Sequence, residues 1–384
     1  MADLNPANIP MSLYVHMPWC VRKCPYCDFN SHAVPNGALS LDLEQEYLKA
    51  LVEDFKTQVD FAQGRKVHSV FIGGGTPSLI SAKGYQGLFD QLRTMIPFEE
   101  SCEITLEANP GTVEHDPFAG YLEAGINRLS IGVQSFNSEH LNKLGRIHSN
   151  ADAISAIGLA REAGFDRINV DLMHGLPEQT LEQALLDLKL AVEHGATHIS
   201  WYQLTIEPNT VFFRTQPVLP VDDVLEDIQE QGEAYLKAQG FINYEVSAWR
   251  KELPSNHNLN YWQFGDYLAI GAGAHGKVSM SDGVYRFQKT RLPKDYLAKV
   301  PAENLQFKKI EAAEMPFEFM MNALRLNQGV TAEYYAERTG LALSTLDDSL
   351  TSLRARKLMV DNQSRIACTA QGHVFLNSVL EAFL

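Results

Sequence analysis

The fold of this chain is constrained above all by an alternation of short apolar runs with longer amphipathic stretches. Runs rich in β-branched and aromatic residues lie at 13–16, 69–72, 103–107, 128–133, 167–172 and 198–204. They are apolar almost throughout, as is typical of parallel strands that are buried on both faces. Helical patterns lie between them, at 43–61, 85–95, 118–124, 151–163 and 181–194. Strands and helices in this order predict an α/β fold of βα units around a parallel sheet.

Six βα units suit an incomplete (β/α)6 barrel as well as a flat doubly wound sheet, and periodicity alone leaves both open. After residue 240 the pattern changes to predicted strands at 241–246 and 267–272, separated by a polar, aromatic loop. The last part is predicted to be helical at 312–325, 332–339, 343–357 and from 370, with a strand pair at 359–361 and 365–368. We therefore predict a barrel over 10–240, an extension over 241–300 and a C-terminal helical, winged-helix-like domain over 303–384.

The charge balance bears on the partners of the chain. Its 47 acidic and 32 basic residues leave a formal net charge of −15. Binding to a nucleic-acid backbone depends on a basic excess, so this balance argues against nucleic acid as the main partner. The helix predicted at 343–357 mixes acidic and basic side chains, which favours packing or partner docking over DNA binding. No apolar run approaches the length of a membrane span and no secretory signal is recognisable, so we expect a cytoplasmic protein.

Three of the five cysteines lie close together in the sequence. Cys20, Cys24 and Cys27 form a Cys-x3-Cys-x2-Cys pattern directly after the first predicted strand. Three thiolates on one loop can each bind an iron of a [4Fe-4S] cubane, which leaves the fourth iron open to a bound molecule. The alternative is a zinc site with His16 or His32 as the fourth ligand. The other two cysteines, Cys102 and Cys368, are predicted to be buried core residues.

A glycine-rich turn, Gly-Gly-Gly-Thr-Pro-Ser at 73–78, follows the second predicted strand. Its glycines allow the backbone to approach a ligand closely. Together with the cysteine loop, this turn resembles the radical S-adenosylmethionine (SAM) superfamily, whose members have an incomplete (β/α)6-type barrel. The resemblance implies that SAM binds the open iron, and that an electron from the cluster cleaves it to methionine and a 5′-deoxyadenosyl radical.

Polar residues follow the remaining strands, where barrel active sites are built. Glu107, Gln134, Arg146 and Asp171 stand at these positions. In this order they resemble the oxygen-independent coproporphyrinogen III oxidase family and its relatives, over nearly the whole chain. The resemblance implies SAM contacts at Tyr14, Tyr26, Gly74, Gly75, Thr76, Glu107, Gln134, Arg146 and Asp171.

Two departures separate the chain from the decarboxylating oxidase. That enzyme has a further cysteine two residues after the third cluster ligand, where this chain has Phe29. It also carries a longer segment before the first strand. We therefore expect SAM cleavage without coproporphyrinogen oxidation, and the sequence assigns no catalytic residue.

The segment 256–262 matches the His-Asn-x-x-Tyr-Trp pattern of the HemW-type heme chaperones, which are relatives of that oxidase. His257 offers an imidazole for heme iron, and Tyr261 and Trp262 offer flat apolar surfaces for a macrocycle. The alternative for His257 is a structural histidine that is hydrogen-bonded in a polar loop. His275, in a glycine-rich turn, is a second and weaker candidate for heme binding.

The resemblance to these chaperones implies a protein that holds a [4Fe-4S] cluster, SAM and heme. Its implied partners are acceptor hemoproteins, including membrane-bound respiratory enzymes, and a reductant protein for the cluster. A homodimer stays open, because no residue pattern identifies an interface. The alternative function is oxidative decarboxylation of porphyrinogen propionates by the deoxyadenosyl radical.

Overall fold

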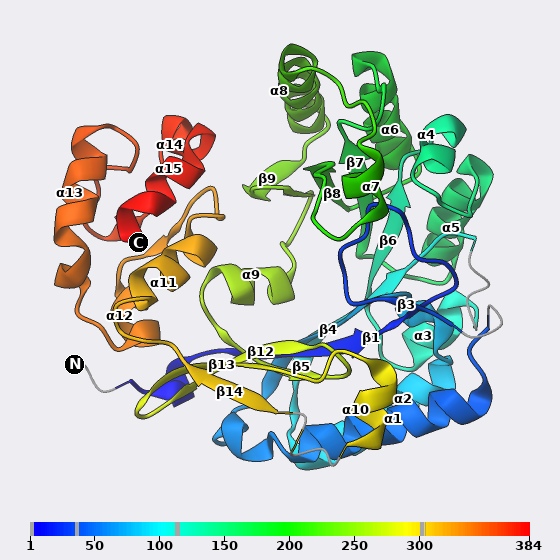
Figure 1. Cartoon of the computed structure of the whole chain (residues 1–384), viewed down its shortest axis with the longest axis horizontal. Helices are drawn as coiled ribbons and strands as arrows, with labels where there is room; N and C mark the ends of the chain where they lie inside the picture. Colours follow the sequence, from blue (N-terminus) through cyan, green and yellow to red (C-terminus); the bar gives the residue numbers. More distant parts are fainter. Residues whose placement is uncertain (1–3, 35–37, 112–115, 300–302, 304) are drawn as a thin grey trace.

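The computed structural model describes residues 4–34, 38–111, 116–299, 303 and 305–384, and a single large sheet lies at its centre (Figure 1). Within these residues the strand order is β14-β13-β12-β11-β1-β4-β5-β6-β7-β8-β10-β9. The parallel part of the sheet consists of β1 (Met11–Met17), β4 (Val67–Gly74), β5 (Phe98–Ala108), β6 (Arg128–Gln134), β7 (Ile168–His174) and β8 (His198–Gln203). These are the six strands that the apolar runs predicted, so the βα interpretation is confirmed.

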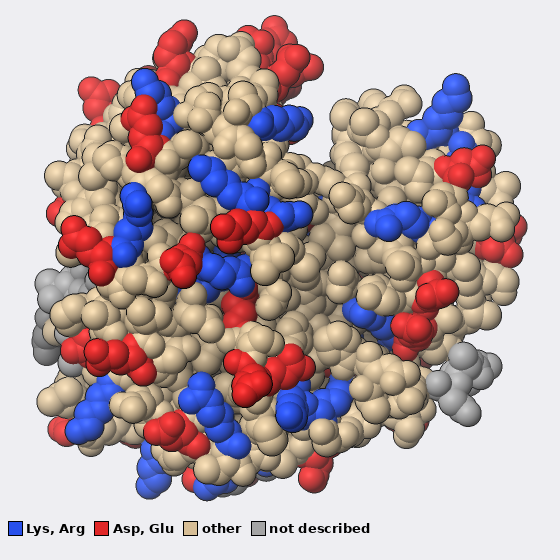
Figure 2. All heavy atoms as spheres, turned by 180° about the vertical axis from the view of Figure 1, so that it is seen from behind, with Lys and Arg blue, Asp and Glu red and all other residues tan. Residues whose placement is uncertain are grey.

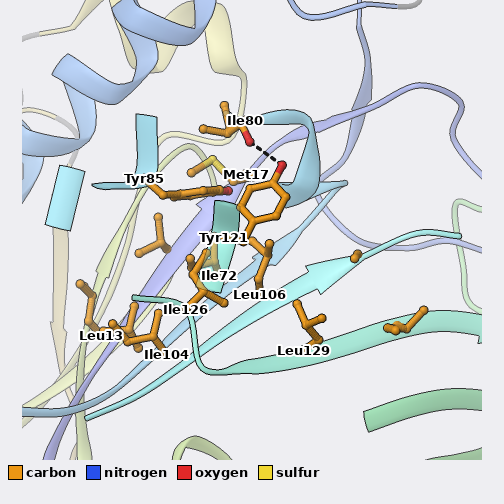
Figure 3. Packing of buried hydrophobic residues seen from close by; sticks show 14 of the residues in the cluster. Leu13, Met17, Ile72, Ile80, Tyr85, Ile104, Leu106, Tyr121, Ile126 and Leu129 are labelled. Carbon is orange, nitrogen blue, oxygen red and sulfur yellow. Dashed lines mark hydrogen bonds between the residues drawn. The ribbon is translucent and has the colours of Figure 1, made fainter. Parts of the chain in front are cut away.

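Amphipathic helices pack on the outer face of the parallel strands (Figure 1). They are α1 (Leu41–Lys56), α2 (Ala82–Met95), α3 (Phe118–Glu123), α4 (Ser138–Lys143), α5 (Asn150–Glu162), α6 (Leu181–Glu193) and α8 (Asp222–Ala238). The short helix α7 (Val211–Thr215) lies instead against the cysteine loop, where the backbone N–H of Phe212 donates to the Pro25 carbonyl oxygen at 3.0 Å. Between helices and sheet lies a dense apolar core, in which the Tyr121 hydroxyl donates to the carbonyl oxygen of Ile80 at 2.8 Å (Figure 3). This hydrogen bond satisfies a buried hydroxyl that would otherwise lose its solvation.

The barrel is open, because its two edge strands pair with other partners and not with each other. At one edge β8 pairs with β10 (Ala248–Arg250), which pairs with β9 (Ile242–Glu245). At the other edge β1 pairs in parallel with β11 (Asp266–Ile270). The antiparallel strands β12 (His275–Met280), β13 (Gly283–Gln288) and β14 (Gln306–Lys309) continue from there, and α10 (Pro293–Ala298) precedes β14. The predicted extension thus enlarges the barrel sheet at both edges.

The segment 256–262, predicted as a loop, forms helix α9 (Asn256–Trp262). Three asparagines make it a poor helix former in isolation. Ser255 caps the helix by accepting a hydrogen bond from the backbone N–H of Asn258 at 3.3 Å. Glu103 Oε1 accepts from Ser255 Oγ at 3.1 Å and from the backbone N–H of His257 at 3.3 Å. A carboxylate far away in the sequence therefore stabilises the helix at its N-terminus, where the helix dipole favours negative charge.

The C-terminal domain (orange to red in Figure 1) is helical, as predicted, and its hydrophobic core also includes Leu4, Ile9, Phe264 and Val284 from outside the domain. Its elements are α11 (Met315–Ala323), β15 (Val330–Thr331), α12 (Glu333–Thr339), α13 (Asp347–Ala355), β16 (Arg365–Ile366), α14 (Ala370–Val374) and α15 (Leu376–Leu380). The predicted pairing of 359–361 with 365–368 is wrong in its main partner, because β16 pairs with β15. Among the described residues, the two predicted strands are joined by the isolated bridge between Met359 and Cys368. The predicted boundary at 300–303 lies mostly outside the described residues.

Seen from behind, a hollow separates this domain from the larger lobe, and acidic and basic side chains are interspersed on the visible face (Figure 2). Among the described helices, none combines the length and the apolar character needed to cross a bilayer. Cys102 and Cys368 are both buried, in agreement with their predicted place in the core.

Candidate functional site

A cavity of about 320 Å³ lies at the C-terminal ends of the parallel strands and is lined by the three clustered cysteines. We call it the first cavity. Eight of the nine residues predicted to contact SAM line it, namely Tyr26, Gly74, Gly75, Thr76, Glu107, Gln134, Arg146 and Asp171. The ninth, Tyr14, lines an adjoining cavity instead. Segments that are far apart in sequence thus meet in the arrangement that the sequence predicted, as expected where parallel strands end at one edge.

The cysteine loop is held closed at its base by two short parallel strands, β2 (Trp19–Cys20) and β3 (His32–Ala33). All three thiols are free and half-buried, and the backbone N–H of Cys27 donates to the carbonyl oxygen of Cys24 at 3.2 Å. Burial raises the pKa of the Cys20 and Cys27 thiols, so a bound cation is needed to hold them as thiolates near neutral pH. Three such thiols beside a cavity fit the donor set of a [4Fe-4S] cubane with one open iron.

The alternative zinc site finds less support in the geometry. Within the described ranges, no three His, Cys, Asp or Glu side chains converge as a single metal ion requires. His16 uses both ring nitrogens already, one with the Tyr14 hydroxyl and one with the Asn30 carbonyl oxygen, each at 2.9 Å. A cubane places each thiolate on a different iron, so its ligands need not converge on one point.

The glycine turn is seated directly against the cysteine loop. A side chain at Gly75 would place its Cβ 2.3 Å from the Trp19 carbonyl oxygen, and one at Gly74 would reach 2.5 Å from the His16 ring. The Gly74 backbone has a φ of 113°, which L side chains rarely adopt. Glycine is therefore required here by the protein's own packing, in addition to any close approach of a ligand.

Arg146 joins the cluster loop to two of the strand ends. Its Nη2 donates to Asn109 Oδ1 at 2.6 Å and to the Gly132 carbonyl oxygen at 2.5 Å, and its Nη1 lies 3.7 Å from Cys24 Sγ. A guanidinium fixed by two acceptors is well placed to bind a carboxylate that enters the cavity.

Several lining residues were not predicted from the sequence, namely Arg128, Ser130, Asn169, Ser200 and Tyr202. Tyr202 donates to Gln134 Oε1 at 2.9 Å, and Ser130 and Asn169 donate to the Asp171 carboxylate at 3.0 and 2.7 Å. Their signal in the sequence was a polar residue at every second position of an otherwise apolar strand, as at Asn169 and Asp171, which places both on the inner face.

Glu107 is half-buried and lies between the first cavity and the adjoining one. It accepts a hydrogen bond from the backbone N–H of Gly74 at 3.1 Å. Burial, reinforced by the negative charge of Asp171, raises the pKa of Glu107 to about 8. The free protein therefore holds this side chain protonated at neutral pH, as a hydrogen-bond donor as well as an acceptor.

This raised pKa predicts a pH dependence of stability. Between the ordinary pKa of 4.5 and about 8, the folded state keeps a proton that the unfolded state releases. The free energy of unfolding should therefore fall as the pH rises through this window, by about 1 kcal/mol per pH unit. Urea unfolding of SAM-free protein should show that Glu107→Gln removes this part of the slope. The exposed control Glu123→Gln should keep the wild-type slope, and a Glu107→Gln profile parallel to wild type would contradict the prediction.

A second cavity of about 630 Å³ adjoins the first, and both are lined by Phe29, Gly74 and Glu107. Phe29, which replaces a cysteine of the oxidase pattern, is 61% exposed at this junction. The second cavity is further lined by Tyr14, His16, Asp28, Asn30, Tyr261, Trp262, Tyr267, Gly273, His275, Gln288, Arg291 and Asn322.

Helix α9 borders both cavities, with Asn258 on the first and Tyr261 and Trp262 on the second. His257 lines neither. Its ring is 1% exposed and stacks on Phe71 with the ring centroids 5.1 Å apart, and its Nδ1 lies 3.4 Å from Ser69 Oγ. In this conformation the imidazole predicted to contact heme is enclosed beneath the helix.

Comparison with known proteins identifies the family of the chain. The radical SAM superfamily model matches residues 14–191, and the HemN C-terminal domain model matches residues 310–375. The chain is 50% identical over 378 residues to heme chaperone HemW of Haemophilus influenzae, covering 98% of each chain. It is 49% identical to heme chaperone HemW of Escherichia coli, again over 98% of each, and 33% identical to that of Bacillus subtilis, over 97% of this chain and 99% of the relative.

The fold also matches a solved structure, that of coproporphyrinogen III oxidase from Escherichia coli, which is described as a radical SAM enzyme. The TM-score is 0.81 at 23% identity, over 99% of this chain and 91% of the other. At this identity the likeness shows the shared fold, and it confirms the predicted radical SAM barrel with its helical C-terminal domain. The full-length identity to the chaperones is much higher, and the chain belongs to the HemW heme chaperone family within the radical SAM superfamily.

Proposed function

We propose that this protein is a heme chaperone, which binds heme and passes it to acceptor hemoproteins. Membership in the radical SAM superfamily implies a [4Fe-4S] cluster and SAM. The observation that carries the proposal is that two different cavities adjoin each other, with Glu107 and Phe29 lining both. The first is bordered by the three thiols and by the charged side chains of Arg128, Arg146 and Asp171, whereas the second is about twice as large and has an aromatic wall, as suits a flat macrocycle.

The residues of the first cavity fit a bound SAM molecule in complementary ways. Arg146 would pair with its carboxylate, and the backbone of Gly74 and Gly75 would allow close approach of its methionyl part. Asp171, whose carboxylate is already oriented by Ser130 and Asn169, suits ribose hydroxyls. When bound, the cluster and SAM together supply an electron and a radical source. The chain's own residues orient the cofactor and keep water away from it.

The alternative is coproporphyrinogen oxidation, because the second cavity could accept a porphyrinogen beside the SAM site. The exposed Phe29 at the junction counts against it, since it stands where the oxidase pattern has a cysteine. We propose that SAM is cleaved without decarboxylation of a porphyrinogen.

One experiment separates the two functions. Anaerobically reconstituted protein is titrated with heme by absorbance and is then incubated with coproporphyrinogen III, SAM and a reductant. We expect saturable heme binding, transfer of the heme to an added apo-hemoprotein, and no protoporphyrinogen. Formation of protoporphyrinogen without stable heme binding would establish the oxidase instead. Protein without its cluster serves as the control for any dependence of transfer on the cluster.

The remaining partners follow from this proposal. We propose a cytoplasmic protein whose cluster is reduced by a separate electron-transfer protein and whose heme acceptors include membrane-bound respiratory enzymes. A homodimer remains to be tested by light scattering of the reconstituted protein, with and without heme.

A further inference from the structure

The second cavity has the chemical features that heme recognition requires. Tyr261, Trp262 and Tyr267 give it an aromatic wall, and Phe29 adds a ring at its border with the first cavity. Large aromatic surfaces bind a macrocycle through apolar burial and stacking. Its volume of about 630 Å³ lies in the range of about 300–1,000 Å³ that is usual for small-molecule sites. The cavity therefore has both the size and the surface for a flat, largely apolar ligand.

His275 offers an available imidazole in this cavity. It begins strand β12, its side chain is exposed, and its ring makes no hydrogen bond with any other described residue. An imidazole whose ring nitrogens are not engaged by the protein keeps a lone pair that can be donated to iron.

Arg291 supplies a positive charge on the same cavity. Its side chain is exposed, and within the described part of the chain no carboxylate forms an ion pair with it. An uncompensated guanidinium beside an aromatic cavity is suited to a carboxylate at the edge of an otherwise apolar ligand. A heme has this combination, since its propionates extend from one edge of the macrocycle.

His257 differs from His275, because its side chain is buried and does not line the second cavity. Its ring is enclosed between Phe71 and Tyr261, with centroid distances of 5.1 and 4.6 Å. Its Nε2 is buried without a hydrogen-bond partner among the described residues. To reach iron with that nitrogen, helix α9 would have to leave the sheet. In the packed state, His257 acts as a positioning residue that seats Tyr261 against the second cavity.

We propose that heme binds in the second cavity with His275 facing the iron, Arg291 facing a propionate, and Phe29 and Trp262 contacting the macrocycle. This assignment rests on the proposed heme chaperone function and names the site at which the heme is held. His257 contributes indirectly, through the seating of α9.

The test compares two histidine variants by heme titration of cluster-reconstituted protein. His275→Ala should lose the absorbance signature of imidazole-bound heme and bind heme about tenfold more weakly. Imidazole added to the solution should restore the signature, because it can occupy the space left by the side chain. His257→Phe keeps a ring packed on Phe71 but removes the ligating nitrogens, and it should keep the wild-type signature. His194→Ala, at the C-cap of the outer helix α6, is the matched control.

Arg291 is tested with a change in the ligand. Arg291→Ala should weaken the binding of heme about two- to fivefold, as expected for a charge pair near solvent. It should not alter the binding of heme dimethyl ester, which lacks the propionate charges. An equal loss for both ligands would overturn the assignment of Arg291.

The outcomes distinguish this site from the function on which it rests. Wild-type heme binding together with an unchanged His275→Ala variant would overturn the site and leave the chaperone function standing. Loss of the signature in His257→Phe alone would assign the iron to His257 and require α9 to move. If the wild-type protein binds no heme, the result contradicts both the proposed function and the proposed site.

Discussion

The Cys24→Ala variant is expected to assemble no [4Fe-4S] cluster and to cleave no SAM. The cluster loop offers three thiols within the described residues, and a cubane with one open iron needs all three. The loop itself should stay folded, because its base is held by the β2–β3 pairing and by hydrogen bonds that the backbone N–H groups of Gly75 and Thr76 donate to the carbonyl oxygens of Met17 and Trp19. Iron and sulfide analysis after anaerobic reconstitution measures the effect, and SAM cleavage gives an independent readout.

Two matched controls are available in the same chain. Cys102→Ala and Cys368→Ala remove buried cysteines that lie outside the first cavity, and both should retain wild-type iron and sulfide. A Cys24→Ala protein with full iron and sulfide content would exclude the proposed ligand set. Zinc in place of iron in the wild-type protein would instead support the alternative zinc site, with His16 or His32 as the fourth ligand.

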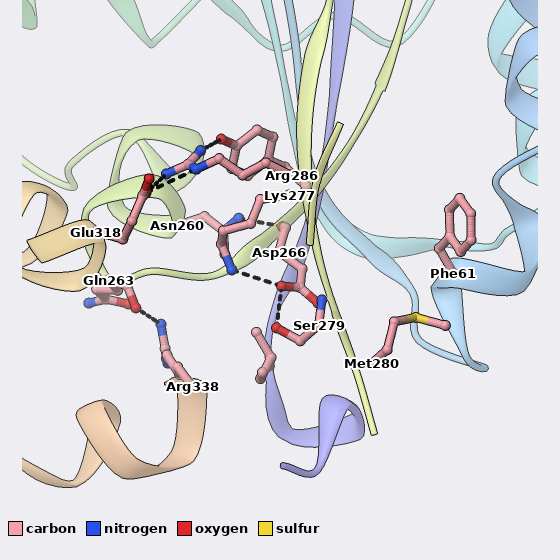
Figure 4. A network of polar contacts seen from close by, with 12 residues as sticks. Phe61, Asn260, Gln263, Asp266, Lys277, Ser279, Met280, Arg286, Glu318 and Arg338 are labelled. Carbon is pink, nitrogen blue, oxygen red and sulfur yellow. Dashed lines mark hydrogen bonds and ion pairs between the residues drawn. The ribbon is translucent and has the colours of Figure 1, made fainter. Parts of the chain in front are cut away.

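The second large effect concerns Asp266, at the start of β11. Its carboxylate is fully buried and accepts from Lys277 Nζ at 3.0 Å and from Ser279 Oγ at 2.9 Å (Figure 4). It also accepts from Arg65 Nη1 at 2.7 Å. Burial alone would raise the pKa of Asp266, but the charges of Lys277 and Arg65 outweigh it and lower the pKa below its ordinary value. The carboxylate is therefore ionised in the folded state and compensates two buried cations.

Asp266→Asn should lower the free energy of unfolding by about 3–5 kcal/mol, because it leaves Arg65 and Lys277 buried without a counter-charge. Urea unfolding at neutral pH measures this loss. Asp282→Asn, which removes a largely exposed carboxylate near Lys309, should cost less than about 0.5 kcal/mol. Equal stabilities for the two variants would show that the buried network is not required. In the wild type, this contribution should disappear as the pH falls through the lowered pKa of Asp266.

The same network affects the second cavity as well as stability. The backbone carbonyl oxygen of Asp266 accepts from Asn260 Nδ2, on helix α9, at 2.7 Å. The next residue, Tyr267, lines the second cavity. The buried charges thus hold in place a strand and a helix that both border the proposed heme site. Burying these charges costs desolvation free energy, and the positioning of the two elements is a physical reason for that cost.

The sequence by itself determined the features that depend on short spacings. Three cysteines within one loop predict a cluster site, wherever in the fold that loop is placed. An apolar run followed by an amphipathic stretch predicts a βα unit, whichever other strands and helices pack against it. The residues predicted to contact SAM could also be chosen from the sequence, because parallel strands end at a common edge and the residues near those ends meet there. Eight of the nine line the first cavity, and Tyr14, on β1, lines the second.

Only the tertiary structure decided how the extension packs. Helix α9 forms from a segment with weak helix propensity because Glu103, 152 residues away from Ser255, accepts hydrogen bonds at its N-terminus. The same packing encloses His257 and leaves His275 open, although the sequence favoured His257 as the heme contact. Burial depends on which distant segments cover a side chain, and no local pattern contains that information. The aromatic cavity beside the cluster site is for this reason a product of the fold.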